Sequence, residues 1–371
     1  MKTEYSFTTA LALLTLGLCV AGASAVFVGR FTQKGQAEWP LSTVRVVIER
    51  NSPGSTVQLS FDCTRGGCNY YVDISVNCGE FTTTKAVLVS TEVSTIDVDY
   101  ALGGSAKDVN LMELEIIKVT ETNTESSVWG SFLLADITGA KSVKGATSCL
   151  KPRSHKILVF GDSLSCGYGV LGQSPCPFTG ETESARLAWA ALVAEAVNAE
   201  IDLVCWSGKG VVRNYGEKTT TSPQPLPAFY NSTLGSMVGD PANYWDPQKY
   251  SPDLVMIYLG ANDYSTDPHP TDEEFVGGYQ RFVAQIKSDY PSSHILLITD
   301  EFSMANSNIK AKNVEKVAGL TQSLFYQFPL STVPDGDSWG CNGHPNVDMQ
   351  RNMASTVTPV VAAALSANGD K

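Results

Sequence analysis

Three residues that can offer hydrogen-bond donors from their side chain or backbone N–H lie at the ends of apolar runs in the C-terminal half of the 371-residue chain. Ser163 follows the run 156–161, Gly208 ends the run 201–208, and Asn262 follows the run 253–260. The runs are apolar on both faces, as strands of a covered parallel sheet are, and the carboxyl ends of such strands meet at one edge. A serine in a turn at that edge can present its hydroxyl and its own N–H to one carbonyl group. We therefore predict a nucleophile at Ser163 and an oxyanion hole formed by Ser163, Gly208 and Asn262.

The nucleophile needs a base, and the sequence contains four histidines. A serine hydroxyl reacts poorly until a neighbouring group takes its proton. His155 and His294 stand at the beginning of expected strands, at the opposite edge of the sheet, and His269 lies between two prolines in a turn. His344 lies in the glycine-rich segment 339–346, before the last expected helix, where its side chain can face the strand ends. We predict His344 as the general base.

Each motif also has a simpler interpretation when it is taken alone. The Gly-Asp-Ser-Leu string at 161–164 could be a strand-to-helix turn in which a polar side chain caps the helix. Gly210 is an alternative to Gly208 as the second N–H donor. Trp206 and Trp339 are candidates for stacking on a ring of a bound substrate, but tryptophans beside a sheet are at least as often part of the core.

The pattern of the C-terminal half indicates the elements that would hold these residues. A fourth apolar run at 294–300 completes a set of expected strands. Helices are expected at 185–197, from about Thr271, and after Pro345 and Asn346 toward residue 365. This alternation predicts a catalytic domain over residues 151–371, a three-layer α/β/α sandwich with a parallel sheet.

The N-terminal half has a different periodicity. Short runs rich in Val, Ile, Thr, Phe and Tyr alternate with polar clusters and occupy 43–49, 55–62, 69–76, 85–91 and 112–121. The alternation of apolar and polar residues has the period of half-buried strands, and there is no pattern of a long amphipathic helix. We predict an all-β, jelly-roll-like sandwich over residues 26–150.

The N-terminus has the composition of a secretory signal. Residues 10–20 form an apolar run after Lys2, and the small residues Ala23, Ser24 and Ala25 follow. We predict that residues 1–25 are a signal peptide and that the mature protein is secreted. No later run approaches the length of a membrane span.

The number of cysteines agrees with a protein that passes through the oxidising secretory route. There are nine, and removal of Cys19 with the signal peptide would leave an even number, for which disulfides are the default. Because no histidine lies near Cys63 and Cys68, we expect no zinc site there. Short loops favour some pairs, and the remaining pairings stay open. The favoured pairs join Cys63 to Cys68 or Cys78, and Cys166 to Cys176.

Charge and a modification motif narrow the possible partners. The formal net charge of −12 is of the wrong sign for attraction to phosphate backbones, so a nucleic acid is not expected. The sequence Asn231-Ser232-Thr233 is an acceptor for N-glycosylation and predicts an exposed loop with a glycan on Asn231.

The order of the motifs resembles that of the SGNH/GDSL hydrolase superfamily. The string at 161–164, Gly208, the Gly-Ala-Asn-Asp string at 260–263 and the late His344 correspond to its four blocks. Residues 207–216 and 339–346, together with a preceding β-sandwich, are similar to carbohydrate esterase family 2. This resemblance covers nearly the whole chain after residue 25. It implies that the serine is the nucleophile, that the glycine and the asparagine complete the oxyanion hole, and that the histidine is the base, which are the roles predicted above from their positions.

One position departs from the superfamily pattern. Members usually carry an aspartate three residues before the histidine, where this chain has Cys341. A thiol or disulfide cannot fix the imidazole tautomer as a carboxylate does. Since some members of the resembling family work as Ser-His dyads, we predict that a backbone carbonyl near Trp339 orients His344. Asp337 and Asp335 are the alternative orienters.

The resemblance implies a secreted carboxylic ester hydrolase that removes acetyl groups from plant polysaccharides such as xylan and glucomannan. No metal or organic cofactor is implied, and we expect a monomer that binds acetylated polysaccharide or oligosaccharide and does not bind membranes. Two alternatives remain. One is a GDSL-type lipase or other acyl hydrolase, because the four blocks do not specify the alcohol. The other is a non-catalytic carbohydrate-binding protein.

Overall fold

The structure is a computed structural model that describes residues 25–64, 68–79, 87–101, 109–125, 128–143, 153–303, 306–333 and 339–367. Residues 1–24 of the predicted signal peptide lie outside these ranges, as does the predicted domain boundary at residue 150. Among the described helices, none has the length and apolarity that crossing a membrane requires.

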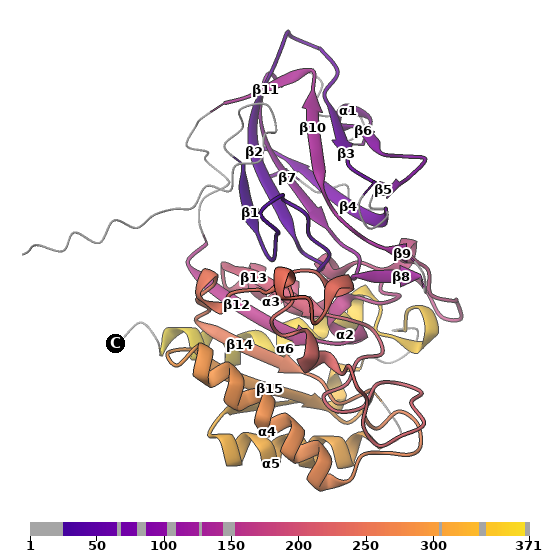
Figure 1. Ribbon diagram of the computed structural model, residues 1–371, viewed down its shortest axis with the longest axis vertical. Helices are drawn as coiled ribbons and strands as arrows, with labels where there is room; N and C mark the ends of the chain where they lie inside the picture. The colour runs from indigo at the N-terminus through magenta and orange to yellow at the C-terminus, as the bar shows by residue number, and fades with distance from the viewer. Residues whose placement is uncertain are drawn as a thin grey trace, which may run out of the picture.

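The N-terminal half consists of two antiparallel sheets, as the sequence predicted (Figure 1). Their inward-facing side chains, such as Leu59, Val72 and Leu114, are fully buried between the sheets. The larger sheet contains, in spatial order, β1 (Val26–Val28), β2 (Thr43–Arg50), β7 (Leu111–Lys118), β4 (Asn69–Val76) and β5 (Val87–Ser90), with β11 (Ala140–Ser142) also paired to β2. The smaller sheet contains β10 (Leu134–Thr138), β3 (Gln58–Phe61) and β6 (Thr95–Asp97). The short elements α1 (Val98–Ala101), β8 (Asn123–Glu125) and β9 (Val128–Trp129) lie outside them.

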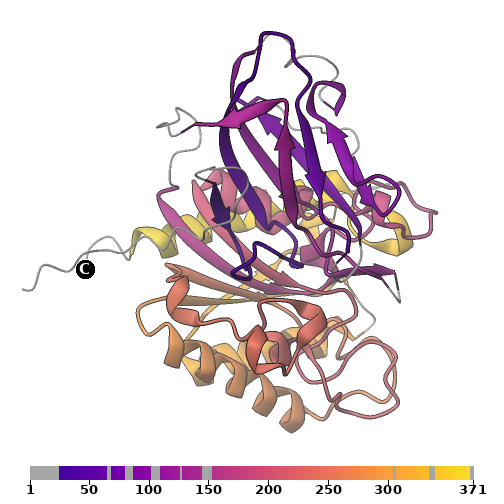
Figure 2. The ribbon, with the colours of Figure 1, turned by 45° about the horizontal axis from the view of Figure 1, so that its top comes forward.

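The C-terminal half is built on a parallel sheet whose strands follow the order β13-β12-β14-β15-β16. Figure 2 shows the yellow helix α6 on one side of this sheet and the orange helices α4 and α5 on the other. Alternate residues of β12 divide between the two cores, because Leu158 and Phe160 pack with α4 and α5 while Ile157 and Val159 pack with α3 and α6. The strands are β12 (His155–Gly161), β13 (Ala199–Cys205), β14 (Leu254–Tyr258), β15 (His294–Asp300) and β16 (Leu324–Phe328). The helices are α2 (Ser163–Cys166), α3 (Trp189–Ala196), α4 (Asp272–Asp289), α5 (Ser307–Thr321) and α6 (Val347–Ser366). The predicted three-layer architecture is confirmed.

Short 3-10 helices occupy the connections of the C-terminal half. They span Gly180–Thr182, Ala185–Leu187, Leu226–Phe229, Gly235–Met237, Pro241–Asn243, Pro247–Lys249, Leu330–Thr332 and Cys341–Gly343. The second of them replaces the beginning of the helix that we expected over 185–197. Strand β16 and helix α5 were not predicted, because they carry exposed side chains such as Leu324 and Leu320 that obscure the apolar pattern.

The N-terminal half covers the free edge of β13. Arg30 donates to Asp202 on this strand at 3.1 Å, and both side chains are buried. Arg30 also donates to the carbonyl of Tyr230 at 2.6 Å. A second buried link joins Glu38 to the backbone N–H of Ser236 at 2.8 Å. These bonds give buried polar groups of one half partners in the other half.

The disulfides agree only in part with the expected pairs. Cys63 is bonded to Cys68, one of the two partners that the sequence favoured. The predicted pairing of Cys166 with Cys176 is wrong. Helix α2 ends beside the neighbouring strand β13, so Cys166 lies 5.7 Å from Cys205 between Cα atoms and is bonded to it. Cys176 is bonded to Cys341, 165 positions away, and Cys78 is disulfide-bonded but not to Cys63.

We expected the glycosylation motif on an exposed loop, but the structure places it in a largely buried segment. Ser232 and Thr233 are buried, with 4% and 6% of their surface exposed, and Asn231 is half-buried. The reason is a short bridge between Ser232 and Tyr244, which draws this segment against the body of the domain.

Candidate functional site

The first strand of the parallel sheet delivers Ser163 into a tight turn. Strand β12 ends at Gly161, and α2 begins at Ser163. Between them Asp162 caps the helix, since its Oδ1 accepts a hydrogen bond from Leu164 N at 3.1 Å. Gly161 is required because a Cβ there would lie 2.2 Å from the Ser165 hydroxyl oxygen. The turn therefore holds the serine at the carboxyl edge of the sheet.

His344 lies directly against this serine. Its Nε2 is 2.8 Å from Ser163 Oγ, although 181 positions separate the residues. Its Nδ1 is 3.2 Å from the carbonyl oxygen of Asn342. If Nδ1 donates to that carbonyl, Nε2 has no proton and can accept one from the serine. Burial lowers the pKa of His344 to about 4, and the Asn342 carbonyl partly offsets this effect, so the imidazole is neutral at neutral pH.

The carbonyl that faces the imidazole lies near Trp339 in the sequence, as predicted, but it belongs to Asn342 and not to Trp339 itself. The carbonyl of Trp339 accepts a hydrogen bond from Ser174 N at 2.9 Å. Asn342 takes this place because it adopts a left-handed conformation with φ of 51°, which turns the chain back toward the histidine. The alternative orienters Asp335 and Asp337 lie outside the described residues.

Gly208 is placed to offer its N–H to the cavity beside Ser163. It lines this cavity and has a φ of 80°, which strongly favours glycine. In the described part of the chain, neither its N–H nor that of Ser163 donates to another protein atom. Gly210, the alternative, is instead packed tightly, because a Cβ there would lie 2.0 Å from the Arg213 carbonyl oxygen. The N–H of Gly210 donates to Asn214.

Asn262 reaches the same cavity from the end of β14, but its amide is engaged. Nδ2 donates to the carbonyl of Lys209 at 2.9 Å and approaches Asp162 Oδ2 at 3.3 Å. The first bond anchors the side chain, and the longer second one can be exchanged for a substrate oxygen. Burial raises the pKa of Asp162 to about 7. When the Asp162 carboxyl is protonated it carries no charge, and it then accepts the hydrogen bond from the Asn262 amide less strongly.

The loop that carries Gly208 is held by the side chain of Asp263. Asp263 is fully buried and accepts hydrogen bonds from the N–H groups of Val211, Val212 and Arg213 at 2.8 to 2.9 Å. Three backbone donors on one side chain fix the course of the chain after Gly208. The contact joins the end of β14 to a loop about 50 positions earlier, which the Gly-Ala-Asn-Asp string alone does not indicate.

A cavity of about 700 Å³ surrounds these groups. Trp339 lines it, whereas Trp206 does not and packs on Phe229 with ring centroids 5.0 Å apart. The lining also includes residues that sequence analysis missed. These are Tyr168, Tyr215, Phe302, Ser303 and Asn342.

Tyr168 supports the histidine from one side. Its ring lies 4.4 Å from the imidazole and is stacked at 3.7 Å on Phe178, and its hydroxyl accepts a hydrogen bond from Asn342 at 3.1 Å. No sequence motif marks Tyr168, because its position four residues after Asp-Ser-Leu has meaning only once α2 ends in the turn at Gly167.

One group of potential metal ligands is present among the described residues, formed by Glu121, Cys166 and Glu183. Cys166 is in a disulfide with Cys205, so its sulfur is not a thiolate ligand. The remaining two carboxyl groups lie at the junction of the two halves.

The arrangement matches known proteins in sequence as well as in geometry. Residues 157–357 match the family described as GDSL-like lipase/acylhydrolase, and this segment covers more than half of the chain. The chain belongs to the GDSL-like lipase/acylhydrolase family. The matched segment contains Ser163, Gly208, Asn262 and His344.

The chain is similar in sequence to bacterial enzymes. An acetylxylan esterase/glucomannan deacetylase of Cellvibrio japonicus is 32% identical over 208 residues, which are 55% of this chain and 56% of that protein. The cellulase/esterase CelE of Acetivibrio thermocellus is 31% identical over 217 residues, 56% of this chain and 25% of that protein. The chain therefore spans about half or less of the length of these two relatives.

Solved structures share the whole fold. A family two carbohydrate esterase from Clostridium thermocellum in complex with cellohexaose is 24% identical with a TM-score of 0.75, covering 92% of this chain and 99% of that one. A family two carbohydrate esterase from Cellvibrio japonicus is 22% identical with a TM-score of 0.73, covering 92% and 95%. At these identities the similarity establishes the two-part fold that we predicted.

Proposed function

We propose that this protein is a carbohydrate esterase that removes acetyl groups by a Ser-His mechanism. The observation that carries the proposal is the 2.8 Å contact between His344 Nε2 and Ser163 Oγ in a cavity lined by Gly208 and Asn262. A nucleophile, a neutral base and positioned N–H donors are together what acyl transfer requires.

In the first half-reaction, Ser163 Oγ attacks the acetyl carbonyl carbon while His344 Nε2 takes the serine proton. The negative charge that develops on the carbonyl oxygen is stabilised by the N–H groups of Ser163 and Gly208 and by the Asn262 amide. The bond to the sugar oxygen then breaks, and His344 returns the proton to that oxygen. The products are a free sugar hydroxyl and an acetyl-serine.

In the second half-reaction, water takes the place of the sugar. His344 accepts a proton from the water as it attacks the acetyl-serine, and the same donors stabilise the second oxyanion. Collapse of this intermediate releases acetate, and Ser163 recovers its proton from His344. No group beyond the protein and water enters either half-reaction.

The substrate class is supported by the relatives. The names of two Cellvibrio japonicus relatives, acetylxylan esterase/glucomannan deacetylase, combine the two polysaccharides that we propose here. We also propose that the protein is secreted after loss of residues 1–25 and acts as a monomer. The even number of cysteines after removal of Cys19 supports the secreted route.

Acetate release from acetylated xylan and acetylated glucomannan tests the proposal, with Ser163→Ala as the inactive control. We expect release by the wild type and loss of at least about 10³-fold in kcat in the variant. Comparison of p-nitrophenyl acetate with a long-chain p-nitrophenyl ester separates this function from a lipase, which would prefer the long chain. Unchanged acetate release by Ser163→Ala would refute the mechanism.

A further inference from the structure

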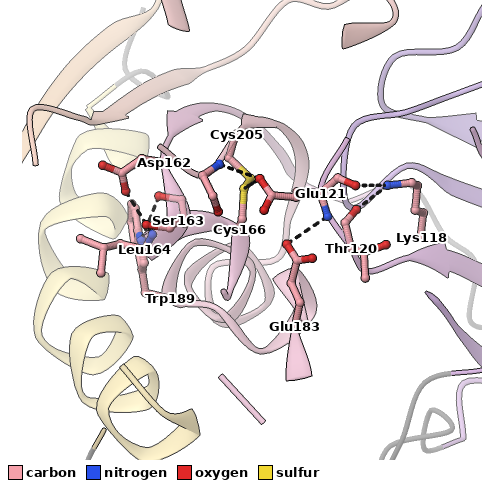
Figure 3. Close-up of a disulfide and its surroundings, with 12 residues drawn as sticks. Lys118, Thr120, Glu121, Asp162, Ser163, Leu164, Cys166, Glu183, Trp189 and Cys205 are labelled. Atoms are coloured by element: carbon pink, nitrogen blue, oxygen red, sulfur yellow. Dashed lines mark hydrogen bonds between the residues drawn. A yellow bond between two sulfur atoms is a disulfide. The ribbon is translucent and has the colours of Figure 1, made fainter. Parts of the chain in front are cut away.

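A carboxyl group of the N-terminal half contacts the oxyanion-hole loop of the C-terminal half. Glu121 follows strand β7 by three positions and is 2% exposed. Its Oε2 accepts a hydrogen bond from the backbone N–H of Ser207 at 2.6 Å. Ser207 directly precedes Gly208, so this bond reaches the neighbour of the proposed oxyanion donor. Figure 3 shows Glu121 pointing from the strand of Lys118 toward the Cys166–Cys205 disulfide.

The position of Glu121 is itself constrained by its neighbours. Its own N–H donates to Glu183 Oε1 at 3.0 Å, and its carbonyl accepts from Lys118 Nζ at 2.8 Å. Lys118 and Glu183 are 0% and 1% exposed. The side chain thus extends from a fixed backbone into the C-terminal half, and it has little freedom to adopt another rotamer.

The same place carries a covalent link between the nucleophile and the loop. Cys166 ends α2, whose first residue is Ser163, and it is bonded to Cys205 at the end of β13, two positions before Ser207. Its sulfur lies 3.8 Å from Glu121 Oε2. The disulfide fixes where the loop begins, and the carboxyl group fixes the direction of the Ser207 N–H.

The direction of this N–H affects the donor next to it. The bond to Glu121 fixes the peptide group that precedes Ser207, and the carbonyl of Gly208 accepts a hydrogen bond from Tyr215 N at 2.8 Å, which fixes the peptide group that follows Gly208. The peptide group between them carries the Gly208 N–H. Its orientation therefore follows from two anchored neighbours, and an oxyanion donor contributes fully only when it is oriented before reaction.

We propose that Glu121 is a positioning residue of the oxyanion hole, which acts through the N–H of Ser207 on the Gly208 N–H without touching substrate. This inference rests on the proposed esterase function. It makes the β-sandwich a working part of the site, because the sandwich supplies the group that orients a donor of the C-terminal half.

The charge of Glu121 is not what the positioning needs. Burial raises the pKa of Glu121 to about 7 and that of Glu183 well above its usual range, and burial lowers the pKa of Lys118 to about 8. Since a carbonyl oxygen also accepts from an N–H, Glu121→Gln should keep the contact.

The test uses the full chain and steady-state hydrolysis of p-nitrophenyl acetate. Glu121→Ala should lower kcat by about 10- to 100-fold with KM within about twofold, because a displaced donor weakens the transition state and leaves ground-state binding unchanged. Glu121→Gln should recover kcat to within about fivefold of the wild type. A kcat of Glu121→Ala within about threefold of the wild type would overturn the inference.

Glu38→Ala is the matched control. Glu38 is also a fully buried glutamate of the N-terminal half that accepts from a backbone N–H of the C-terminal half, but that N–H belongs to Ser236, which does not line the catalytic cavity. We expect a comparable fall in Tm and a kcat within about twofold of the wild type. Equal losses of kcat in Glu38→Ala and Glu121→Ala would assign the effect to general destabilisation and overturn the inference.

A further variant covers the case in which Glu121→Ala does not fold. Glu121→Asp keeps a carboxyl group but is one methylene shorter, so it cannot make the same bond to Ser207, and kcat should fall about 10-fold at unchanged KM. Full kcat in Glu121→Asp would overturn the inference. Failure of the esterase proposal would look different, because the wild type and Ser163→Ala would then hydrolyse the ester equally.

Discussion

Lowering the pH should leave the proposed base active well into the acid range. His344 accepts the serine proton only in its neutral form. Burial lowers the pKa of His344 to about 4, from 6.5 for an unperturbed histidine. A lowered pKa for a base means that the inactive, protonated form appears only at lower pH. Activity should therefore be complete at neutral pH and decline as the pH falls through the range of this pKa.

The size of the effect follows from the two pKa values. At pH 5 a histidine with a pKa of about 4 is ~90% neutral, whereas one with a pKa of 6.5 is ~3% neutral, so the rates should differ by ~30-fold. The assay is kcat/KM for p-nitrophenyl acetate between pH 3.5 and 8, read at the isosbestic wavelength of nitrophenol. We expect the half-maximal value near pH 4.

Two acids near the site require control variants. Burial raises the pKa of Glu121 and of Asp162 to about 7, so either could add a step to the profile. Glu121→Gln and Asp162→Asn each remove one titration while keeping a hydrogen-bonding oxygen. If half of the activity is lost between pH 6 and 7 in the wild type and in both variants, the step belongs to His344 and our explanation of its environment is wrong.

Three further predictions concern the donors, a disulfide and stability. Asn262→Ala should lower kcat for p-nitrophenyl acetate by about 10²- to 10³-fold with little change in KM, and a kcat close to that of the wild type would remove Asn262 from the oxyanion hole. Replacing both Cys176 and Cys341 with serine should lower the free energy of unfolding in urea by about 2–4 kcal/mol and lower kcat, because the disulfide holds the loop of the histidine; unchanged kcat would count against that role. The buried acids Asp162 and Glu121 have raised pKa values, so as the pH falls from 7 to 5 the folded state holds protons that the unfolded state has released, and each such proton raises the free energy of unfolding by up to about 1.4 kcal/mol per pH unit. His344 has a lowered pKa and opposes this below about pH 6.5 by up to one proton, so the net free energy of unfolding should still rise. Lower stability at pH 5 than at pH 7 would contradict this assignment.

The predictable part of the site consists of residues at strand ends. Ser163, Gly208 and Asn262 follow or end apolar runs that are typical of strands in a covered parallel sheet, and such strands bring their carboxyl ends to one edge whatever the loops do. His344 could be assigned by elimination, because the other histidines belong at the opposite edge or in a turn. The lengths of the strands differed by a few positions only, since side-chain alternation marks a strand better than its ends.

The unpredicted part consists of contacts between segments that no local pattern connects. Cys166 pairs with Cys205 because the end of α2 lies beside β13, and that neighbour is chosen by the order of strands in the sheet. Glu121 reads in sequence as the polar end of a strand, and its contact with Ser207 depends on how the two halves pack. The roles of Tyr168 and Asn342 could not be predicted, because their contact depends on two loops that lie side by side only in the folded chain.

The cysteine at position 341 has a consequence for how the rate is divided among the groups of the site. It is bonded to Cys176, so the position that could have carried a carboxylate is occupied, and the described partner of His344 Nδ1 is the neutral carbonyl of Asn342. A carbonyl dipole can fix the tautomer, but it offers the imidazolium no counter-charge, in agreement with a pKa of about 4. A base with this low pKa stays neutral, and so active, at a lower pH, but it takes the serine proton with less driving force. More of the stabilisation of the transition state must then come from the oxyanion donors, and for this reason a carboxyl group that orients Gly208 from the neighbouring sandwich can matter to the rate.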